Sequence, residues 1–194
     1  MYESEDAWRD VDAYFVDMLL VEDEALTAAR ESGHKTTMPR AEVAPRASFL
    51  RCCARSRARL AYWSSAPWPA TAPSGWPVRL ADLAGGRRRR SQSARRLIEQ
   101  GAQPFDFVFI DADKPSNPEY LRASLALTAP GSVIVIDNVV RNGAVTDPES
   151  TDDRVRGVRT VLADIARDPR LDATALQTVG FKGWDGFTII RRTR

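Results

Sequence analysis

Apolar residues follow two different patterns along the chain. In residues 6–30 they recur every three or four positions, which predicts an amphipathic helix. Residues 105–113 (FDFVFIDAD) and 132–138 (SVIVIDN) are continuous apolar runs that end in acidic or amide side chains. Runs of this length are typical of parallel strands buried on both faces.

Further segments with clear start and stop signals surround these two predicted strands. They are residues 97–101 (the end of a helix, with Gly101 at its C-cap), 118–128 (a helix begun by Pro118 and ended by Pro130-Gly131), 150–169 (a helix with a Ser/Thr cap), and 174–180 with 185–192 (an antiparallel hairpin). Strands that alternate with helices predict an α/β fold with a doubly wound sheet, closed by the C-terminal hairpin.

Oxygen-bearing side chains gather where the two predicted strands end. Asp111 and Asp113 close the first strand, and Asp137 and Asn138 close the second. Ligands of open α/β sheets bind at the carboxyl ends of the strands. Carboxylate and amide oxygens without Cys or His favour a hard divalent cation such as Mg²⁺ or Ca²⁺. The alternative is that these acids only cap helices or face water.

Lys114 directly follows the first acidic pair. Beside a bound dication the neutral amine is favoured over the ammonium, which makes this lysine a candidate general base. The alternative for a single lysine is a solvated surface charge.

Composition favours one soluble domain. The chain has 194 residues, of which 43% are hydrophobic and 28% charged, and no apolar run is long enough to span a bilayer. The N-terminal MYESEDAWRD lacks the pattern of a signal peptide, and the adjacent Cys52 and Cys53 do not form a disulfide framework. We therefore expect a cytoplasmic protein with no membrane partner.

The segment from residue 46 to residue 96 differs sharply from the rest of the chain. It holds 12 arginines, no lysine and one acid, Asp82, whereas the remainder holds 16 basic and 25 acidic residues. A run such as Arg87–Arg90 could bind nucleic acid without specificity, but the segment lacks aromatic residues at the spacing that base stacking requires. We expect no nucleic-acid partner.

Three stretches together resemble a known family. They are FDFVFIDADKPSNPEYLRASLALTAPGSVIVIDNVVRNGAV, GVRTVLADIARDPRL and KGWDGFTIIRR, and the N-terminal VDAYFVDMLLVEDEAL and MPRAEVAP are similar too. These stretches resemble the cation-dependent O-methyltransferases of the catechol and caffeoyl-CoA type. The resemblance covers residues 8–45 and 97–192, and its most specific feature is IDADK followed by IDNV.

The resemblance implies a Rossmann-like sheet, an activity and a set of site residues. Asp111, Asp137 and Asn138 match the family's metal ligands, Lys114 matches its catalytic base, and Val43 and Asp111 lie where the family contacts its cofactor. The implied reaction moves the methyl group of S-adenosylmethionine to a phenolic hydroxyl, with the divalent cation acidifying that hydroxyl. The resemblance also implies a homodimer.

The family's glycine-rich cofactor loop has no counterpart in residues 46–96 as printed. A shifted frame, in which each codon starts at the third base of a codon of residues 62–77, permits one. In that frame Tyr62-Trp63 can encode only Leu, and Trp68-Pro69 and Trp76-Pro77 can each encode only Ala. One permitted solution is LEFGTLAGYSTIWLA, which is similar to the family's strand, acidic turn, glycine loop and helix. We interpret residues 46–96 as a shortened, out-of-frame part of one O-methyltransferase-like domain spanning residues 1–194, with the frame restored by Leu97.

This interpretation has structural consequences. Proline-rich sequence is expected in the place of a central strand, and the second strand and the acid that holds the cofactor ribose are expected to be missing. The chain is then either a working methyltransferase or a non-catalytic remnant that keeps only the metal face. The acceptor, whether a catechol, a flavonoid or a CoA ester, cannot be read from the sequence.

Overall fold

A computed structural model describes residues 5–19, 60–64, 81–82, 95–180 and 183–194. In these residues the elements are α1 (Glu5–Leu19), β1 (Leu60–Ser64), β2 (Ala81–Asp82), β3 (Phe105–Asp111), the 3-10 helix η1 (Lys114–Ser116), α5 (Asn117–Ala126), β4 (Thr128–Asp137), the 3-10 helix η2 (Ala144–Thr146), α6 (Asp153–Arg167), β5 (Leu171–Thr178) and β6 (Asp185–Arg192).

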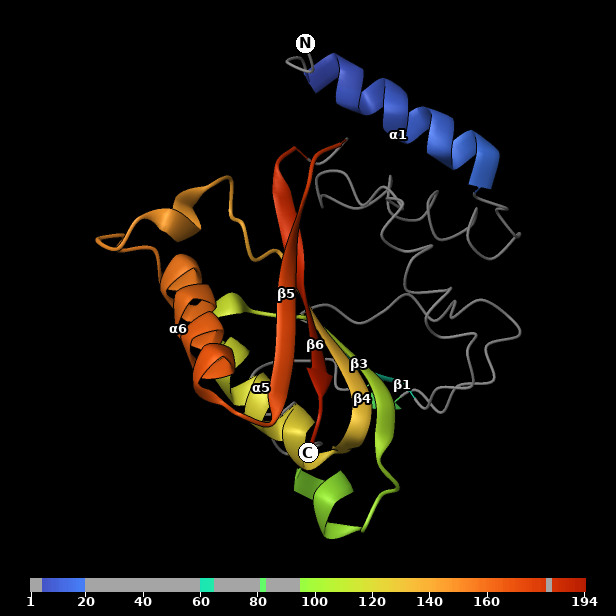
Figure 1. The fold of residues 1–194 in the computed structure, drawn as a ribbon, viewed down its shortest axis with the longest axis vertical. Coiled ribbons are helices and arrows are strands. Elements are labelled where there is room, and N and C mark those ends of the chain that lie inside the picture. The colour runs from blue at the N-terminus through green and yellow to red at the C-terminus, as the bar shows by residue number, and fades with distance from the viewer. Residues whose placement is uncertain (1–4, 20–59, 65–80, 83–94, 181–182) are drawn as a thin grey trace.

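The strands form one mixed sheet in the order β2-β1-β3-β4-β6-β5. The first four of these run parallel, and β6 lies antiparallel to both β4 and β5. The hairpin of β5 and β6 therefore adds to the β4 edge of the parallel strands (Figure 1). This arrangement confirms the predicted Rossmann-like α/β fold with a closing antiparallel hairpin.

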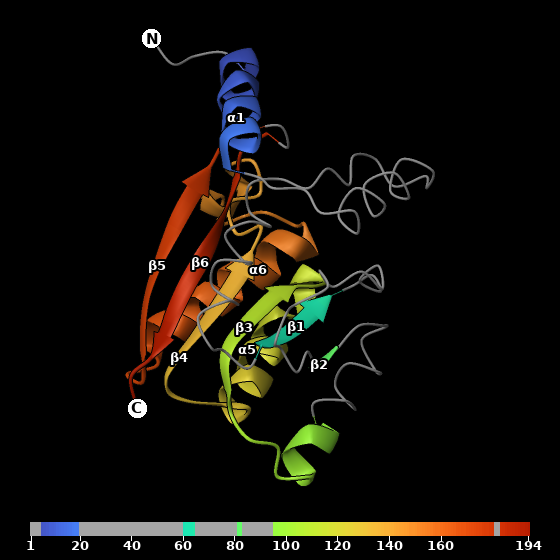
Figure 2. The ribbon, with the colours of Figure 1, turned by 90° about the vertical axis from the view of Figure 1, so that its right-hand side faces the viewer.

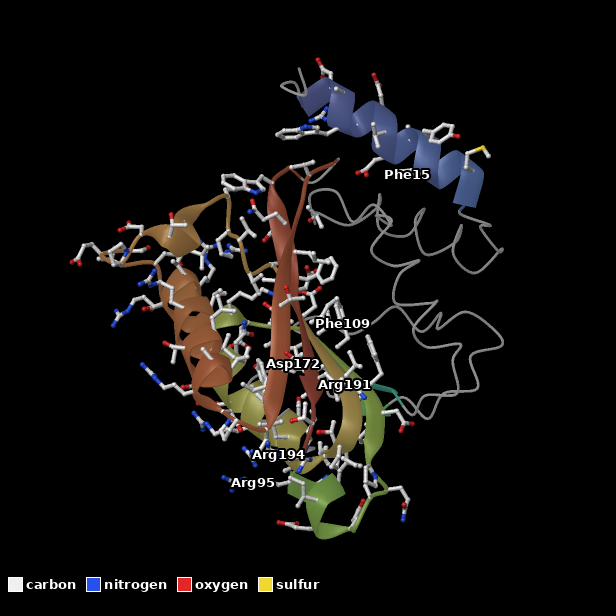
Figure 3. All side chains as sticks on the ribbon, viewed as in Figure 1. Phe15, Arg95, Phe109, Asp172, Arg191 and Arg194 are labelled. Atoms are coloured by element: carbon white, nitrogen blue, oxygen red, sulfur yellow. The ribbon has the colours of Figure 1, made fainter. Side chains whose placement is uncertain are left out.

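The core lies between the sheet and the helices α5 and α6, which cover one of its faces (Figure 2). The β3 and β4 side chains at its centre are fully buried, as at Val108, Ile110 and Ile134. Figure 3 contrasts Phe109 of β3, with 7% of its surface exposed, with Phe15 of α1, with 44% exposed. The apolar runs were thus buried strands, as their sequence predicts.

The start of β4 differs from the prediction. Helix α5 ends at Ala126, and β4 begins at Thr128, so Pro130-Gly131 lies inside the strand rather than at the end of a helix. The ladder with β3 is irregular here, with Phe105 paired to Thr128 and Phe107 paired to Val133. This irregularity accommodates a proline, which has no N–H to donate.

The start of α6 also differs from the prediction. Its N-cap is Asp152 rather than a serine or threonine, and the Asp152 Oδ1 accepts a hydrogen bond from the Arg154 N–H at 2.8 Å. An aspartate in this position satisfies one of the free N–H groups of the first turn.

The place beside β3 is filled by a regular strand, and the expectation of proline-rich sequence there was wrong. Strand β1 pairs with β3 along its whole length and ends at Ser64, before the first proline of the segment, Pro67. The second strand was also expected to be missing, and this expectation was wrong, because β2 occupies its place with two residues.

The α1 helix confirms the first part of the helix predicted over residues 6–30, and the remainder lies outside the described residues. It contacts the turn after β5, because a Cβ added at Gly180 would lie 2.0 Å from Asp12 Oδ2. None of the helices in the described ranges is both long and apolar enough to traverse a membrane.

Candidate functional site

The carboxyl ends of β3 and β4 meet at one edge of the sheet. Ile110 is paired with Ile136, so the next residues, Asp111 and Asp137, extend from neighbouring strands at the same level. Asp137 has only 8% of its surface exposed, whereas the Asp111 side chain is 42% exposed. One predicted metal-binding carboxylate is thus buried and the other reaches the surface.

Lys114 is buried against this edge, with 7% of its surface exposed. Its Nζ donates a hydrogen bond to Asp111 Oδ1 at 3.1 Å. The alternative of a solvated surface lysine was therefore wrong. A buried ammonium requires a charge partner, and Asp111 provides it.

The backbone around Lys114 is fixed from two sides. Gly157 of α6 packs so closely that a Cβ there would lie 2.3 Å from the Lys114 carbonyl oxygen. The Asp113 carboxylate accepts hydrogen bonds from the hydroxyls of Ser116 and Tyr120, both of which are buried. Sequence reasoning missed this role of Gly157, because a glycine in a helical pattern gives no sign of what packs against it.

Asn138 directly follows Asp137 and has a left-handed backbone, with φ of 58°. Its N–H donates to Asp137 Oδ1 at 2.8 Å, and its Nδ2 donates to Asp185 Oδ2 at 3.1 Å. The left-handed turn ends the extended strand here, so the Asn138 side chain does not follow the alternation of faces that holds along β4.

The cofactor side of the site is described only in part. Val43 and the loop that contains His34 lie outside the described residues. Strand β1 ends at Ser64, paired with Asp111, and β2 ends at Asp82, paired with Tyr62. Sequence reasoning found no acid for the cofactor ribose. Asp82, the one acid of residues 46–96, is the last residue of β2.

The donor set suits a hard divalent cation. Asp111, Asp137 and Asn138 offer two carboxylates and an amide, the oxygen ligands that Mg²⁺ and Ca²⁺ prefer. Within the described part of the chain, no three His, Cys, Asp or Glu side chains are grouped to hold a metal. The Asn138 amide adds an oxygen donor beside the two carboxylates at this edge.

Comparison with known proteins decides the family. The family model described as O-methyltransferase matches residues 89–193. The chain belongs to the O-methyltransferase family. A "Catechol O-methyltransferase" from Niastella koreensis is 36% identical over 212 aligned residues, covering 94% of this chain and 96% of the relative.

Two solved O-methyltransferases share the fold over nearly the whole chain. One from Bacillus cereus, in complex with SAH, has a TM-score of 0.84 and 32% identity, covering 98% of this chain and 100% of that one. TomG from Streptomyces achromogenes, in complex with SAM and involved in tomaymycin synthesis, has a TM-score of 0.80 and 34% identity, covering 99% and 100%.

The alignment with the Niastella relative is longer than this O-methyltransferase itself. It spans 212 residues, whereas the chain has 194, so it includes positions that this chain lacks. A shortened segment is in keeping with this difference in length.

Proposed function

We propose that the chain transfers the methyl group of S-adenosylmethionine to one hydroxyl of a catechol-type phenol, with the help of a divalent cation. The observation that carries the proposal is the buried Lys114 held 3.1 Å from Asp111, beside Asp137 and Asn138 at the same sheet edge. The names of the Niastella relative and of the SAM- and SAH-bound neighbours support the acceptor class and the methyl donor.

In this proposal Asp111, Asp137 and Asn138 hold the cation, which when bound supplies Lewis acidity to the acceptor hydroxyl. Lys114 accepts the phenolic proton as the neutral amine, the form that a cation held by Asp111 in place of the ammonium would favour. The phenolate oxygen then attacks the methyl carbon in line, so that the C–O bond forms as the C–S bond of the sulfonium breaks. The products are the methyl ether, S-adenosylhomocysteine and protonated Lys114. Positioning of the two reactants provides much of the acceleration.

Val43 and Asp111 are the cofactor contacts that we propose from the family resemblance. For the chain as printed, Asp82 is a further candidate, because an acid at the end of the second strand of such sheets binds the ribose hydroxyls. If residues 46–96 are out of frame, this acid is not the family's residue. Asp82→Ala should then leave the affinity for S-adenosylmethionine unchanged.

We also propose a cytoplasmic homodimer that needs no nucleic acid or membrane. The exposed apolar side chains of α1 support a subunit contact, and they are Val11, Tyr14, Phe15 and Met18. The chain's two cysteines are adjacent and give no disulfide framework, which supports a reducing compartment.

A radiolabelled methyl-transfer assay tests the proposed function. Purified protein is incubated with methyl-labelled S-adenosylmethionine and catechol, with Mg²⁺ or with EDTA. We expect transfer with Mg²⁺, none with EDTA or in Asp137→Ala, and unchanged transfer in the surface control Asp172→Ala, on exposed β5. Transfer that survives EDTA would overturn the cation's role. No transfer under any condition, from protein that is folded by circular dichroism, would overturn the activity of this chain.

A further inference from the structure

The Asp185 carboxylate, at the start of β6, accepts four hydrogen bonds from two separate segments. Its Oδ1 accepts from the backbone N–H groups of Val140, Arg141 and Gly186, at 3.2, 3.2 and 3.0 Å. Its Oδ2 accepts from Asn138 Nδ2 at 3.1 Å. Asp185 thus ties the hairpin to the loop that follows β4, across 47 positions of sequence.

These contacts determine which way the Asn138 amide is turned. An ionised carboxylate only accepts hydrogen bonds, so the NH₂ group of Asn138 must face Asp185 and its Oδ1 cannot. The Oδ1 is the atom that a cation would need as a ligand. The three backbone donors on Asp185 Oδ1 in turn fix the plane of the Asp185 carboxylate.

The loop after β4 needs such support because its backbone is strained. Asn138, Arg141 and Asn142 all have positive φ, at 58°, 56° and 54°. Residues other than glycine adopt this region at a cost, and they persist there when the surroundings hold them. Two of the residues that Asp185 contacts, Asn138 and Arg141, are among these three.

We propose that Asp185 is a positioning residue that orients the Asn138 amide oxygen toward the cation site and holds the β4 loop in its strained shape. This inference rests on the proposed function, because it assigns Asn138 Oδ1 to the cation. Outer carboxylates play this part for metal-binding side chains elsewhere, and their loss typically lowers metal affinity 10- to 100-fold.

The variant Asp185→Asn tests the orientation most sharply. Its Oδ1 can still accept the three backbone hydrogen bonds, but its NH₂ group would then face the NH₂ group of Asn138. Two donors cannot pair, so the Asn138 amide flips and presents nitrogen to the cation. We expect the dissociation constant for Mn²⁺, measured by titration calorimetry, to rise by about 10- to 100-fold.

A compensating change separates orientation from a general loss of structure. In Asn138→Asp combined with Asp185→Asn, the new amide can donate to the new carboxylate, which keeps one oxygen for the cation. We expect Mn²⁺ affinity to return to within about tenfold of the wild type, although Asn138→Asp alone sets two carboxylates against each other. Asp172→Asn, on exposed β5, is the control and should leave affinity unchanged.

Two readouts distinguish failure of this inference from failure of the proposed function. Amide exchange by NMR reports the Asn138 side-chain bond without any metal, and we expect protection in the wild type that is lost in Asp185→Asn. The positioning role would be overturned if the wild type binds Mn²⁺ while its Asn138 side-chain amide is unprotected. It would also be overturned if the double variant binds Mn²⁺ as weakly as Asp185→Asn does. If the Asn138 amide is protected but the wild-type protein does not bind Mn²⁺, the hydrogen bond to Asp185 is supported and the proposed cation site is overturned.

Discussion

Residues 105–194 and residues 46–96 belong to one chain but differ in almost every physical property. The first region places buried apolar runs between amphipathic helices and ends its strands in acids and an amide. The second has 12 arginines against one acid, and its tryptophans alternate with prolines. The paired strands of the second region are short, with five residues in β1 and two in β2, whereas β3 and β4 have seven and ten.

Because the two regions differ in this way, the two parts of the proposed reaction, proton removal beside the cation and binding of the methyl donor, depend on different regions. The proton-accepting lysine and the proposed cation ligands all come from the first region. Binding of the methyl donor depends mainly on the second, where the backbone of a glycine loop would approach the cofactor, with Asp111 of the first region as a further proposed contact. Damage to one region should therefore leave the function of the other measurable.

The largest expected effect is the loss of the Lys114 amine. Lys114→Met keeps an unbranched apolar chain in a buried position but cannot accept a proton. General-base catalysis is worth about 10²–10⁴-fold, so kcat should fall by that factor. Arg122→Met, at an exposed position of α5, is the matched control. A kcat within a few-fold of the wild type would remove Lys114 from the mechanism.

The stability of the first region should depend on its central strand. Ile134→Ala removes a fully buried side chain from β4, so the free energy of unfolding should fall by about 2–5 kcal/mol. Thr174→Ala on exposed β5 should change it by less than about 0.5 kcal/mol. Urea unfolding of the three proteins checks both. Equal losses in the two variants would show that β4 is not the core of the fold.

Cofactor affinity should respond strongly to the glycine loop of the second region, in addition to the proposed contacts Val43 and Asp111. Replacing residues 62–77 by LEFGTLAGYSTIWLA restores a glycine loop, and we expect S-adenosylmethionine to bind at least about tenfold more tightly, which is about 1.4 kcal/mol. Calorimetric titration of both chains, with Mn²⁺ affinity as an internal control, gives the comparison. If the printed chain binds S-adenosylmethionine as tightly, the out-of-frame interpretation is wrong.

The smallest effect is a pH dependence at the start of α6. The Arg154 guanidinium, and then its backbone N–H, hydrogen-bond Asp152 and lower the pKa of that carboxyl from 3.8 to about 2. Because the pKa of Asp152 is lower in the folded protein than in the unfolded chain, the ionised carboxylate stabilises the folded state. This contribution is present above about pH 4 and is lost as the pH falls through about 2.

Asp152→Asn keeps a capping oxygen but removes the charge, so its unfolding temperature should lie slightly below the wild type's at pH 7. The gap should close at pH 2. Asp153→Asn, on the next residue, is the control for the loss of a surface charge. A gap that stays constant with pH would contradict the assignment of the pKa shift to stability.

Local pattern predicted the strands and helices of the first region, but it did not predict their long-range contacts. The apolar runs of β3 and β4 could be recognised as strands in the sequence because both faces of each strand are buried. The sequence pattern predicts a helix end at Pro130-Gly131, because the place of this pair inside β4 depends on the register shift between Phe105 and Phe107. The strand ends Asp111, Asp137 and Asn138 could be named from spacing and family resemblance.

The support of those residues could not be predicted from one sequence. Gly157 against Lys114, and Asp185 against Asn138, join positions far apart along the chain. Such contacts produce no periodic pattern of residues in the sequence. Their roles follow only from the fold that brings α6 and β6 beside the strand ends.

Titration of the printed chain with Mn²⁺ tests the central claim, a cation site at the ends of β3 and β4, most directly. We expect one saturable site per chain in the wild type and in Asp172→Ala, and its loss in Asp137→Ala. Binding that is absent from folded wild-type protein, or that is equally tight in Asp137→Ala, would contradict it.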